Sequence, residues 1–355
     1  MRYESSVALA QLDEFDEVVD VRSPAEFAID HVPGAVNCPV LSNEERARVG
    51  TMYKQVSAFE ARKVGAALVA RNAARHIEMH FAARDARWRP LIYCWRGGKR
   101  SGSMTLILRE IGWDAASLHG GYQSYRRGML EQLQELPQGF DFRVICAPTG
   151  SGKSRLLHAL SAQGAQVLDL EALARHRGSV LGDLPGDGQP AQKMFDSLIW
   201  NALRKFDASR PVFVEAESRK IGSVQVPETL LERMRQSRCV RVEAPLAQRV
   251  PFLIAEYGHF LAGPEGLKTQ LSRLTALHSR AVVERWLAQI DAGAWEDLVG
   301  DLLATHYDPA YTRSMGTNYP SLTDALRIKV ARMDEAGFAE GARALLDSAH
   351  PDALK

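Results

Sequence analysis

Residues 93–101 place a cysteine beside glycines and cations, a combination that suits thiolate chemistry. Cys94 ends a short apolar run, and three cations lie within the next six residues. Positive charge favours a thiolate over a thiol, and the N–H groups of a glycine turn at a helix start bind anions. The alternative is a buried, inert cysteine, which would not need these cations. We therefore expect Cys94 to be catalytic, next to an anion-binding loop that consists of Arg96, Gly97, Gly98, Lys99 and Arg100.

A second anion-binding pattern occurs at residues 147–154, with the sequence Ala-Pro-Thr-Gly-Ser-Gly-Lys-Ser. Residues 140–146 predict a strand before it and residues 155–160 a helix after it, which is the setting of a Walker A loop rather than of a chance turn. Ala147 stands where the strict pattern has glycine. Backbone amides and the lysine of such a loop hold phosphates, and its last hydroxyl can hold Mg²⁺. The predicted phosphate-binding residues are Thr149, Gly150, Ser151, Gly152, Lys153 and Ser154.

Carboxylates follow two further predicted strands of the same region. Asp169 ends the apolar stretch that begins at residue 166, and Glu215 and Glu217 follow the apolar residues 211–214. In P-loop folds an acidic residue at such a strand end holds Mg²⁺ or polarises water, although solvated acids also occur at strand ends. These three residues are candidates of equal standing for Mg²⁺ binding or acid–base chemistry. Residues 176–179 and 182–188 form a glycine-rich loop that is expected to cover the phosphates.

The elements that position these residues predict an α/β protein with three parts. Residues 1–136 form a parallel sheet flanked by helices, with a helical insertion at about 42–89. A Pro-Gln-Gly linker at 137–139 leads to an α/β P-loop domain at 140–244, and residues 245–355 form a helical C-terminal region without strand signals. Basic residues of the insertion could contact RNA, and the aromatic residues at 306–311 could stack on a base. Solvated helix faces and a helical core are the commoner reasons for such residues, and they are the favoured explanations here.

Composition narrows the class of protein. The chain has 355 residues, a formal net charge of +1 and 46% hydrophobic residues, which is typical of a globular protein without overall basic character. Its 4 cysteines include no CxxC pair, so neither a zinc site nor a disulfide framework is indicated. The acidic N-terminus lacks signal-peptide features, and no apolar run is long enough to span a bilayer. We therefore expect a cytoplasmic protein that has no membrane contact.

Three stretches of the first domain resemble a rhodanese domain. They are Asp20-Val21-Arg22-Ser23 with Glu26-Phe27, then His31-Val32-Pro33-Gly34-Ala35, and then residues 94–100. The resemblance implies that Cys94 carries sulfur or selenium as a persulfide or perselenide. Asp20 and Arg22 are expected to form a structural ion pair that braces this fold.

A rhodanese domain followed by a P-loop domain and a helical region resembles the bacterial tRNA 2-selenouridine synthase family over nearly the whole chain. Further similar stretches are Asp169-Leu170-Glu171, His176-Arg177-Gly178-Ser179, Val214-Glu215 with residues 217–222, and residues 306–311. The resemblance implies a tRNA-modifying transferase that replaces the sulfur of wobble 2-thiouridine with selenium from selenophosphate. It also implies an S-geranyl-2-thiouridine intermediate, formed from geranyl diphosphate. The expected partners are the tRNA anticodon loop, selenophosphate and geranyl diphosphate. No tightly bound cofactor is expected, and Mg²⁺ could bind together with the diphosphate.

Two other functions agree with the same residues. One is a sulfurtransferase coupled to a P-loop ATPase, in which thiosulfate or a persulfide charges Cys94 and ATP activates the acceptor. The other is a non-catalytic regulator that binds anions or RNA. The cationic loop and the intact Lys153-Ser154 pair argue against the regulator, since a relic would be free to lose them.

Overall fold

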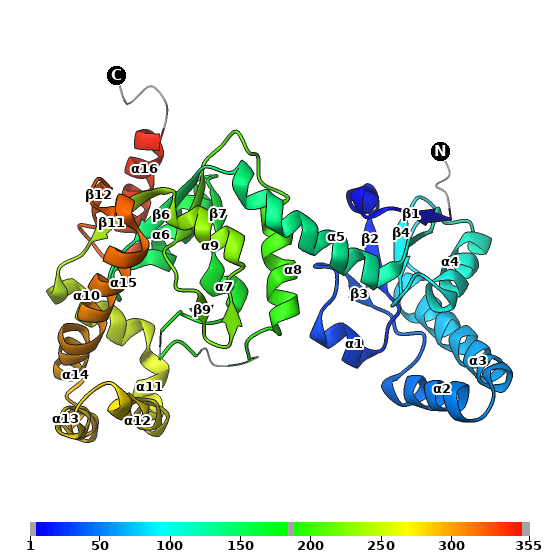
Figure 1. Ribbon diagram of the computed structural model, residues 1–355, viewed down its shortest axis with the longest axis horizontal. Coiled ribbons are helices and arrows are strands. Elements are labelled where there is room, and N and C mark those ends of the chain that lie inside the picture. Colours follow the sequence, from blue (N-terminus) through cyan, green and yellow to red (C-terminus); the bar gives the residue numbers. More distant parts are fainter. Residues whose placement is uncertain (1–4, 180, 184–185, 187, 350–355) are drawn as a thin grey trace. The chain divides into compact units, whose positions relative to one another are not determined.

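The computed structural model describes residues 5–179, 181–183, 186 and 188–349, and the chain divides into two compact units. Unit 1 comprises Met1–Leu133 with Pro190–Asn201, and unit 2 comprises Gln134–Gln189 with Ala202–Lys355. Within the described residues, each unit contains a 5-stranded parallel sheet flanked by helices (Figure 1). The predicted α/β class is therefore confirmed.

In unit 1 the strand that leads to Cys94 lies in the middle of the sheet, whose order is β1-β5-β4-β2-β3. All four residues of the central strand are buried, because helices cover both faces of a parallel sheet. Asp20 lies opposite Tyr93 in the register of the parallel strands β2 and β4. Cys94 therefore lies at the C-terminal end of the strands, as do the residues that follow Asp20. The strands are β1 (Ser6–Val7), β2 (Glu17–Asp20), β3 (Val36–Asn37), β4 (Pro90–Tyr93) and β5 (Ala116–Leu118).

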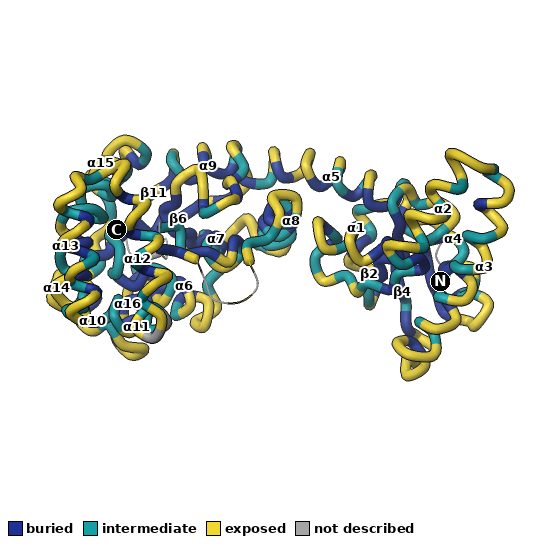
Figure 2. The backbone as a smooth tube through the Cα atoms, turned by 90° about the horizontal axis from the view of Figure 1, so that it is seen from below, coloured by how far each residue is buried: buried dark blue, intermediate teal, exposed yellow. Residues whose placement is uncertain are grey.

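The helices of unit 1 include the insertion expected at 42–89. Ser42 and Ser57 begin its two long helices, and each serine hydroxyl accepts hydrogen bonds from backbone amides of the first turn. Figure 2 shows the exposed outer faces of these helices and the buried strands beside them. The helices are η1 (Leu9–Glu14), α1 (Pro24–Ile29), α2 (Asn43–Gln55), α3 (Ala58–His76), η2 (Ile77–Phe81), α4 (Lys99–Ile111), α5 (Gly121–Glu135) and α8 (Gln192–Leu203).

Helix α8 follows the P-loop region in sequence, yet Pro190–Asn201 belongs to unit 1. Trp200 packs edge-on against Tyr125 of α5, with ring centroids 5.6 Å apart, and its indole N–H donates to Gln132 at 2.8 Å. Arg126 donates to Asp196 at 2.6 Å. The stretch 140–244, which the sequence assigns to a single P-loop domain, therefore supplies one helix to the other unit.

In unit 2 the sheet order is β12-β11-β6-β8-β7, and the P-loop follows the central strand β6. The strands are β6 (Phe142–Cys146), β7 (Gln166–Leu168), β8 (Val212–Glu215), β11 (Arg238–Glu243) and β12 (Leu326–Lys329), with an antiparallel hairpin of β9 (Lys220–Ile221) and β10 (Val224–Gln225). Buried apolar residues of β6, α6 and α16 form one core cluster behind the P-loop.

The region after residue 244 is helical, as predicted, except for β12. This strand pairs in parallel with β11, so the expectation that no strand occurs there was wrong. Its four residues are mostly exposed and show no clean alternation, because β12 is a sheet edge. The helices of unit 2 are η3 (Leu136–Gly139), α6 (Lys153–Ala162), α7 (Leu170–Ala174), α9 (Glu228–Arg235), α10 (Leu246–Glu256), α11 (Gly258–Ala262), α12 (Pro264–Ser272), η4 (Arg273–Ala276), α13 (Arg280–Asp291), α14 (Trp295–Leu302), η5 (Leu303–Tyr307), α15 (Asp308–Asn318), η6 (Pro320–Leu322) and α16 (Glu335–Ala349).

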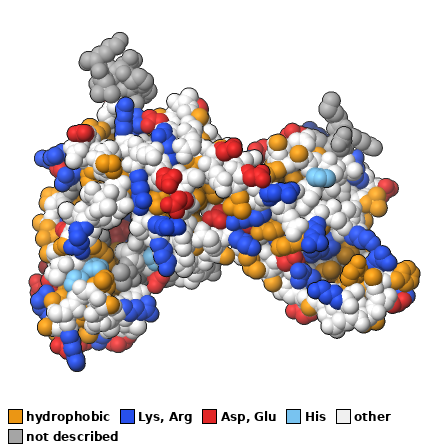
Figure 3. Space-filling view, viewed as in Figure 1, with side chains coloured by type: hydrophobic (Ala, Val, Ile, Leu, Met, Phe, Trp, Pro, Cys, Tyr) orange, Lys and Arg blue, Asp and Glu red, His pale blue; other side chains and the backbone are white. Residues whose placement is uncertain are grey.

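The surface agrees with the nearly neutral composition. On the face shown in Figure 3, Lys and Arg side chains are interspersed with Asp and Glu on both units. Among the described residues, no helix combines the length and the apolar character needed to cross a membrane.

Candidate functional site

Cys94 directly follows β4 and begins a tight loop that leads into α4. Gly97 has a φ of +62°, and a Cβ atom there would lie 2.8 Å from the carbonyl oxygen of Leu118. Only glycine therefore fits this turn. The amide of Tyr122 donates to the Cys94 carbonyl at 2.8 Å, so the start of α5 fixes the base of the loop.

The Cys94 side chain is 3% exposed, and its sulfur accepts a hydrogen bond from the Ser101 hydroxyl at 3.2 Å. Burial by itself raises the pKa of a thiol, but hydrogen bonds from Ser101 and from the Arg96 amide, with the charge of Arg100, outweigh it and lower the pKa of Cys94. The environment of Cys94 therefore favours a thiolate. Ser101 was not among the predicted site residues, and its contact with the sulfur results from its place in the first turn of α4.

The three predicted cations of the loop have different surroundings. Arg100 forms an ion pair with Glu26 at 3.1 Å, and Arg96 donates to Gln123 at 3.2 Å. Burial opposes the ionisation of Glu26, but the charge of Arg100 prevails and lowers the pKa of Glu26. Lys99 is exposed at the start of α4. Part of the positive charge expected for an anion is therefore already neutralised by a carboxylate.

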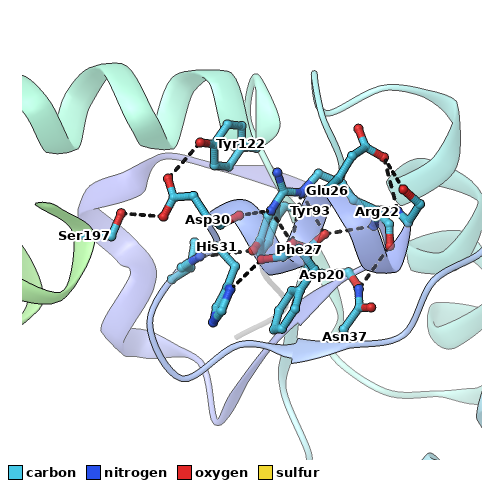
Figure 4. A network of polar contacts seen from close by, with 12 residues as sticks. Asp20, Arg22, Glu26, Phe27, Asp30, His31, Asn37, Tyr93, Tyr122 and Ser197 are labelled. Carbon is cyan, nitrogen blue, oxygen red and sulfur yellow. Dashed lines mark hydrogen bonds and ion pairs between the residues drawn. The ribbon is translucent and has the colours of Figure 1, made fainter. Parts of the chain in front are cut away.

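The expected structural ion pair between Asp20 and Arg22 is confirmed. Both side chains are buried, and Arg22 donates from Nε at 2.9 Å and from Nη2 at 2.6 Å to Asp20 Oδ2 (Figure 4). The guanidinium also donates to the Asp30 carbonyl at 2.6 Å and lies 4.1 Å from the ring centroid of Tyr122. Through these contacts the pair connects β2, the end of α1 and α5, and so it braces the fold as expected.

Asp30 connects α8 to this network. Its two carboxylate oxygens accept hydrogen bonds from Tyr122 at 2.7 Å and from Ser197 at 2.8 Å. Figure 4 shows these two partners approaching Asp30 from different helices. Burial raises the pKa of Asp30, and the two hydroxyl donors and Arg126 offset part of this effect.

The P-loop of unit 2 connects β6 to α6 as predicted. Gly152 has a φ of +76°, and a Cβ atom there would lie 2.3 Å from the ring of Phe338. Lys153 donates to the carbonyl of Ala147 at 3.3 Å, so its ammonium lies across the mouth of the loop. The Ala147 methyl group belongs to the buried core, which explains why the loop tolerates this departure from glycine.

A carboxylate that the sequence analysis did not select faces the last residue of the loop. The Ser154 hydroxyl donates to Glu171 Oε2 at 2.9 Å, and the Glu171 amide donates to Glu215 Oε1 at 2.7 Å. Glu215 Oε2 is buried and has no hydrogen-bond partner among the described residues. In the sequence Glu171 appears only as part of the family-like stretch Asp169-Leu170-Glu171, from which Asp169 was selected as the candidate.

The three predicted carboxylates lie in different environments. Asp169 accepts from the amide of Ala172 at 2.8 Å, which makes it the N-cap of α7, and it lies 3.3 Å from His158. Burial raises the pKa of Glu215, and the neighbouring carboxylates add to this effect. Burial also raises the pKa of Glu217 to about 8, although Lys153 acts in the opposite direction. A protonated Glu215 or Glu217 is a poor ligand for a cation, so Glu171 is better suited to that task than either.

Two arginines that the sequence analysis did not assign complete the cradle. Arg249 of α10 is 5% exposed, donates to the Thr149 carbonyl at 2.8 Å and pairs with both oxygens of Asp308, one of them at 2.6 Å. Arg177 stacks over Tyr257 at 4.5 Å and donates to the Glu256 carbonyl at 3.1 Å. Arg249 positions the loop backbone, whereas Arg177 supplies a cation beside it.

A cavity of about 420 Å³ lies at the P-loop. All six predicted phosphate-binding residues line it, together with Arg155, Asp169, Glu171 and Arg177, whereas Glu215 and Glu217 lie behind it. Of the loop expected to cover the phosphates, His176, Arg177 and Ser179 line this cavity, and residues 184, 185 and 187 lie outside the described residues.

The donor set of this cavity fits Mg²⁺. A hydroxyl and a carboxylate lie 2.9 Å apart at Ser154 and Glu171, and Mg²⁺ is usually held by one or two carboxylates together with substrate phosphates. The described residues contain no group of three or more His, Cys, Asp or Glu side chains arranged for a metal ion. An ion here would therefore depend on the oxygens of a bound phosphate.

Comparisons with known proteins agree with this architecture. A family model for the rhodanese-like domain matches residues 5–127, and the model for the tRNA 2-selenouridine synthase AAA domain matches residues 140–263. The tRNA 2-selenouridine synthase of Nitrosomonas europaea is 39% identical over 244 residues, which cover 68% of this chain but only 63% of that relative. The proteins of the same name from Alcanivorax borkumensis and Hydrogenovibrio crunogenus are each 32% identical, over 83% and 86% of this chain and 88% and 92% of their own lengths.

One solved structure adds a similarity in sequence. The N-terminal domain of a putative ATP/GTP binding protein from Clostridium difficile 630 is 34% identical and covers 36% of this chain and 99% of its own, with a TM-score of 0.32. The similarity to relatives over most of the chain, with a rhodanese-like segment followed by the AAA-domain segment, confirms the predicted resemblance. The chain belongs to the tRNA 2-selenouridine synthase family.

Proposed function

We propose that this protein replaces the sulfur of wobble 2-thiouridine in tRNA with selenium from selenophosphate, through an S-geranyl intermediate. The observation that carries the proposal is the presence, in one chain, of a buried cysteine with a lowered pKa and of an intact P-loop. The names of relatives that align over most of the chain support the tRNA substrate.

The P-loop is assigned the alkylation step. The thiouridine sulfur attacks C1 of geranyl diphosphate, the carbon–oxygen bond breaks, diphosphate leaves and the base releases its N3 proton. Lys153 and the loop amides stabilise the negative charge that grows on the leaving diphosphate. Arg177, at the same cavity, adds to this stabilisation. Ser154 and Glu171 would hold Mg²⁺, which would supply further positive charge to the diphosphate.

The cysteine loop is assigned the selenation step. Sulfur is a poor leaving group from the ring of 2-thiouridine, whereas an S-geranyl group leaves as geranyl thiol. Selenium of selenophosphate replaces it at C2, and water then cleaves the selenium–phosphorus bond and releases phosphate. Cys94 supplies the thiolate that first attacks C2 and expels the geranyl thiol, and the selenium of selenophosphate then displaces the Cys94 sulfur. Lys99 and Arg96 are the exposed cations available to selenophosphate.

The test is mass spectrometry of nucleosides from 2-thiouridine-containing tRNA incubated with the protein, selenophosphate and geranyl diphosphate. The unaltered protein should form 2-selenouridine. Cys94→Ser should accumulate S-geranyl-2-thiouridine, because the P-loop is intact. Lys153→Ala should leave 2-thiouridine unmodified but should still convert tRNA that was geranylated beforehand.

Three results would contradict parts of this scheme. Unchanged 2-thiouridine with the unaltered protein would refute the reaction, and an obligatory requirement for ATP in alkylation would refute the use of the P-loop for geranyl diphosphate. Normal selenation by Cys94→Ser would remove Cys94 from the mechanism.

A further inference from the structure

A small apolar cavity of about 70 Å³ lies beside the P-loop in unit 2. Its walls come from α10, α11, α12, α14 and η5, with Thr149 contributed by the P-loop itself. The lining from the described part of the chain includes aromatic rings such as Phe260, Trp295 and Tyr307 and no charged side chain. Such a lining suits a hydrocarbon group and does not suit a phosphate.

This apolar cavity is continuous in its lining with the phosphate cavity. Thr149, Leu253 and Tyr257 line both of them. Leu253 lies directly over Gly150, where a Cβ atom would be 2.7 Å from its side chain. Tyr257 receives the Arg177 guanidinium on its ring, so a cation lies at the junction. The two cavities together match a molecule with a highly charged head and a short apolar tail.

We propose that the apolar cavity binds the hydrocarbon chain of a short isoprenoid diphosphate whose diphosphate lies on the P-loop. This inference rests on the proposed function and places the hydrocarbon chain among α10, α11, α12, α14 and η5. The reacting C1 carbon would then lie at the junction near Thr149, between the charged and apolar cavities.

The size of the cavity is consistent with part of a geranyl chain. A group the size of a water molecule or a methylene needs about 10–15 Å³ of cavity volume, so a cavity of about 70 Å³ accepts roughly five such groups. Five carbon atoms make one isoprene unit. Burying one such unit should make geranyl diphosphate bind roughly 100-fold more tightly than inorganic pyrophosphate. The rival occupant is the base of a nucleotide, which would stack on the same aromatic rings.

The test is calorimetric binding of geranyl diphosphate, pyrophosphate and ATP to the full chain and to a variant with a filled cavity. Val299→Trp fills the cavity from α14, where Val299 is half-buried, and Ile254→Trp fills it from α10. Glu296→Trp is the matched control, because Glu296 is exposed on the same helix as Val299. Circular dichroism identifies the filling variant that is folded.

The unaltered protein and Glu296→Trp should prefer geranyl diphosphate over pyrophosphate by roughly 100-fold. The filling variant should lose this preference and keep its affinity for pyrophosphate. Equal binding of the two ligands to the unaltered protein, or a preference that survives filling, would overturn the inference. A filling variant that loses ATP binding instead would assign the cavity to a nucleotide base and also overturn it.

Failure of the proposed function gives a different result. If pyrophosphate does not bind, or if Lys153→Ala binds it as well as the unaltered protein, then the assignment of diphosphate to the P-loop is wrong. If pyrophosphate binding depends on Lys153 and the preference for geranyl diphosphate is absent, only the apolar site is refuted.

Discussion

Removal of the Ser101 hydroxyl should raise the pKa of Cys94. The hydroxyl lies 3.2 Å from the sulfur of Cys94, a residue that is only 3% exposed, so solvent cannot readily replace the hydroxyl. A hydrogen bond to a charged group contributes about 1.5–3 kcal/mol and one to a neutral group about 0.5–1.5 kcal/mol, so the thiolate gains about 1.4 kcal/mol more than the thiol. At about 1.4 kcal/mol per pKa unit, Ser101→Ala should raise the pKa of Cys94 by about one unit.

The assay is the rate of Cys94 alkylation by iodoacetamide as a function of pH, followed by mass spectrometry of the peptide that contains Cys94. Only the thiolate reacts, so at pH values below both pKa values the rate should fall about tenfold in Ser101→Ala. Ser103→Ala, on the same helix and half-buried, is the control and should leave the profile unchanged. Ser101→Thr should restore most of the rate. An unmoved profile in Ser101→Ala, or an equal shift in Ser103→Ala, would refute the assignment of the lowered pKa to this hydrogen bond.

Three further predictions concern buried charges. Arg22→Met should lower the free energy of unfolding of unit 1 by about 3–5 kcal/mol, because it leaves Asp20 buried without its partner, and an unchanged urea transition would contradict this. Arg249→Ala should weaken pyrophosphate binding by roughly tenfold in calorimetry, because the carbonyl of Thr149 loses its charged donor; an equal affinity would show that the loop holds its shape alone. Since the pKa of Glu217 is about 8, this side chain is neutral at pH 7 and gains a negative charge near the P-loop lysine as the pH rises through 8. Glu217→Gln should therefore match the unaltered protein at pH 7 and bind pyrophosphate more tightly above pH 8, and identical profiles would contradict the pKa.

The sequence alone located the cysteine loop and the P-loop, the two loops that are predicted to bind anions. In each, the chemistry lies in consecutive residues, and the glycines that the backbone requires, such as Gly97 and Gly152, stand beside the cations. The strand before each loop and the helix after it follow from apolar spacing over a few residues. The pairing of Asp20 with Arg22 was equally accessible, because the two residues are only two positions apart.

The tertiary structure decided which distant side chains complete those loops. Glu171 reaches Ser154 across 17 residues, and Arg249 reaches Thr149 across 100, and no local pattern selects either from the other acids and arginines. The apolar cavity also depends on the tertiary structure, because its walls come from several helices. The apolar pattern of each helix alone is that of an ordinary amphipathic helix and does not indicate a cavity. Helix α8 belongs to unit 1 because its side chains pack against that unit. Strand β12 belongs to the sheet of unit 2 because it pairs with β11. Local conformational preference fixes a contiguous motif, whereas contacts between distant segments depend on how the whole core is filled.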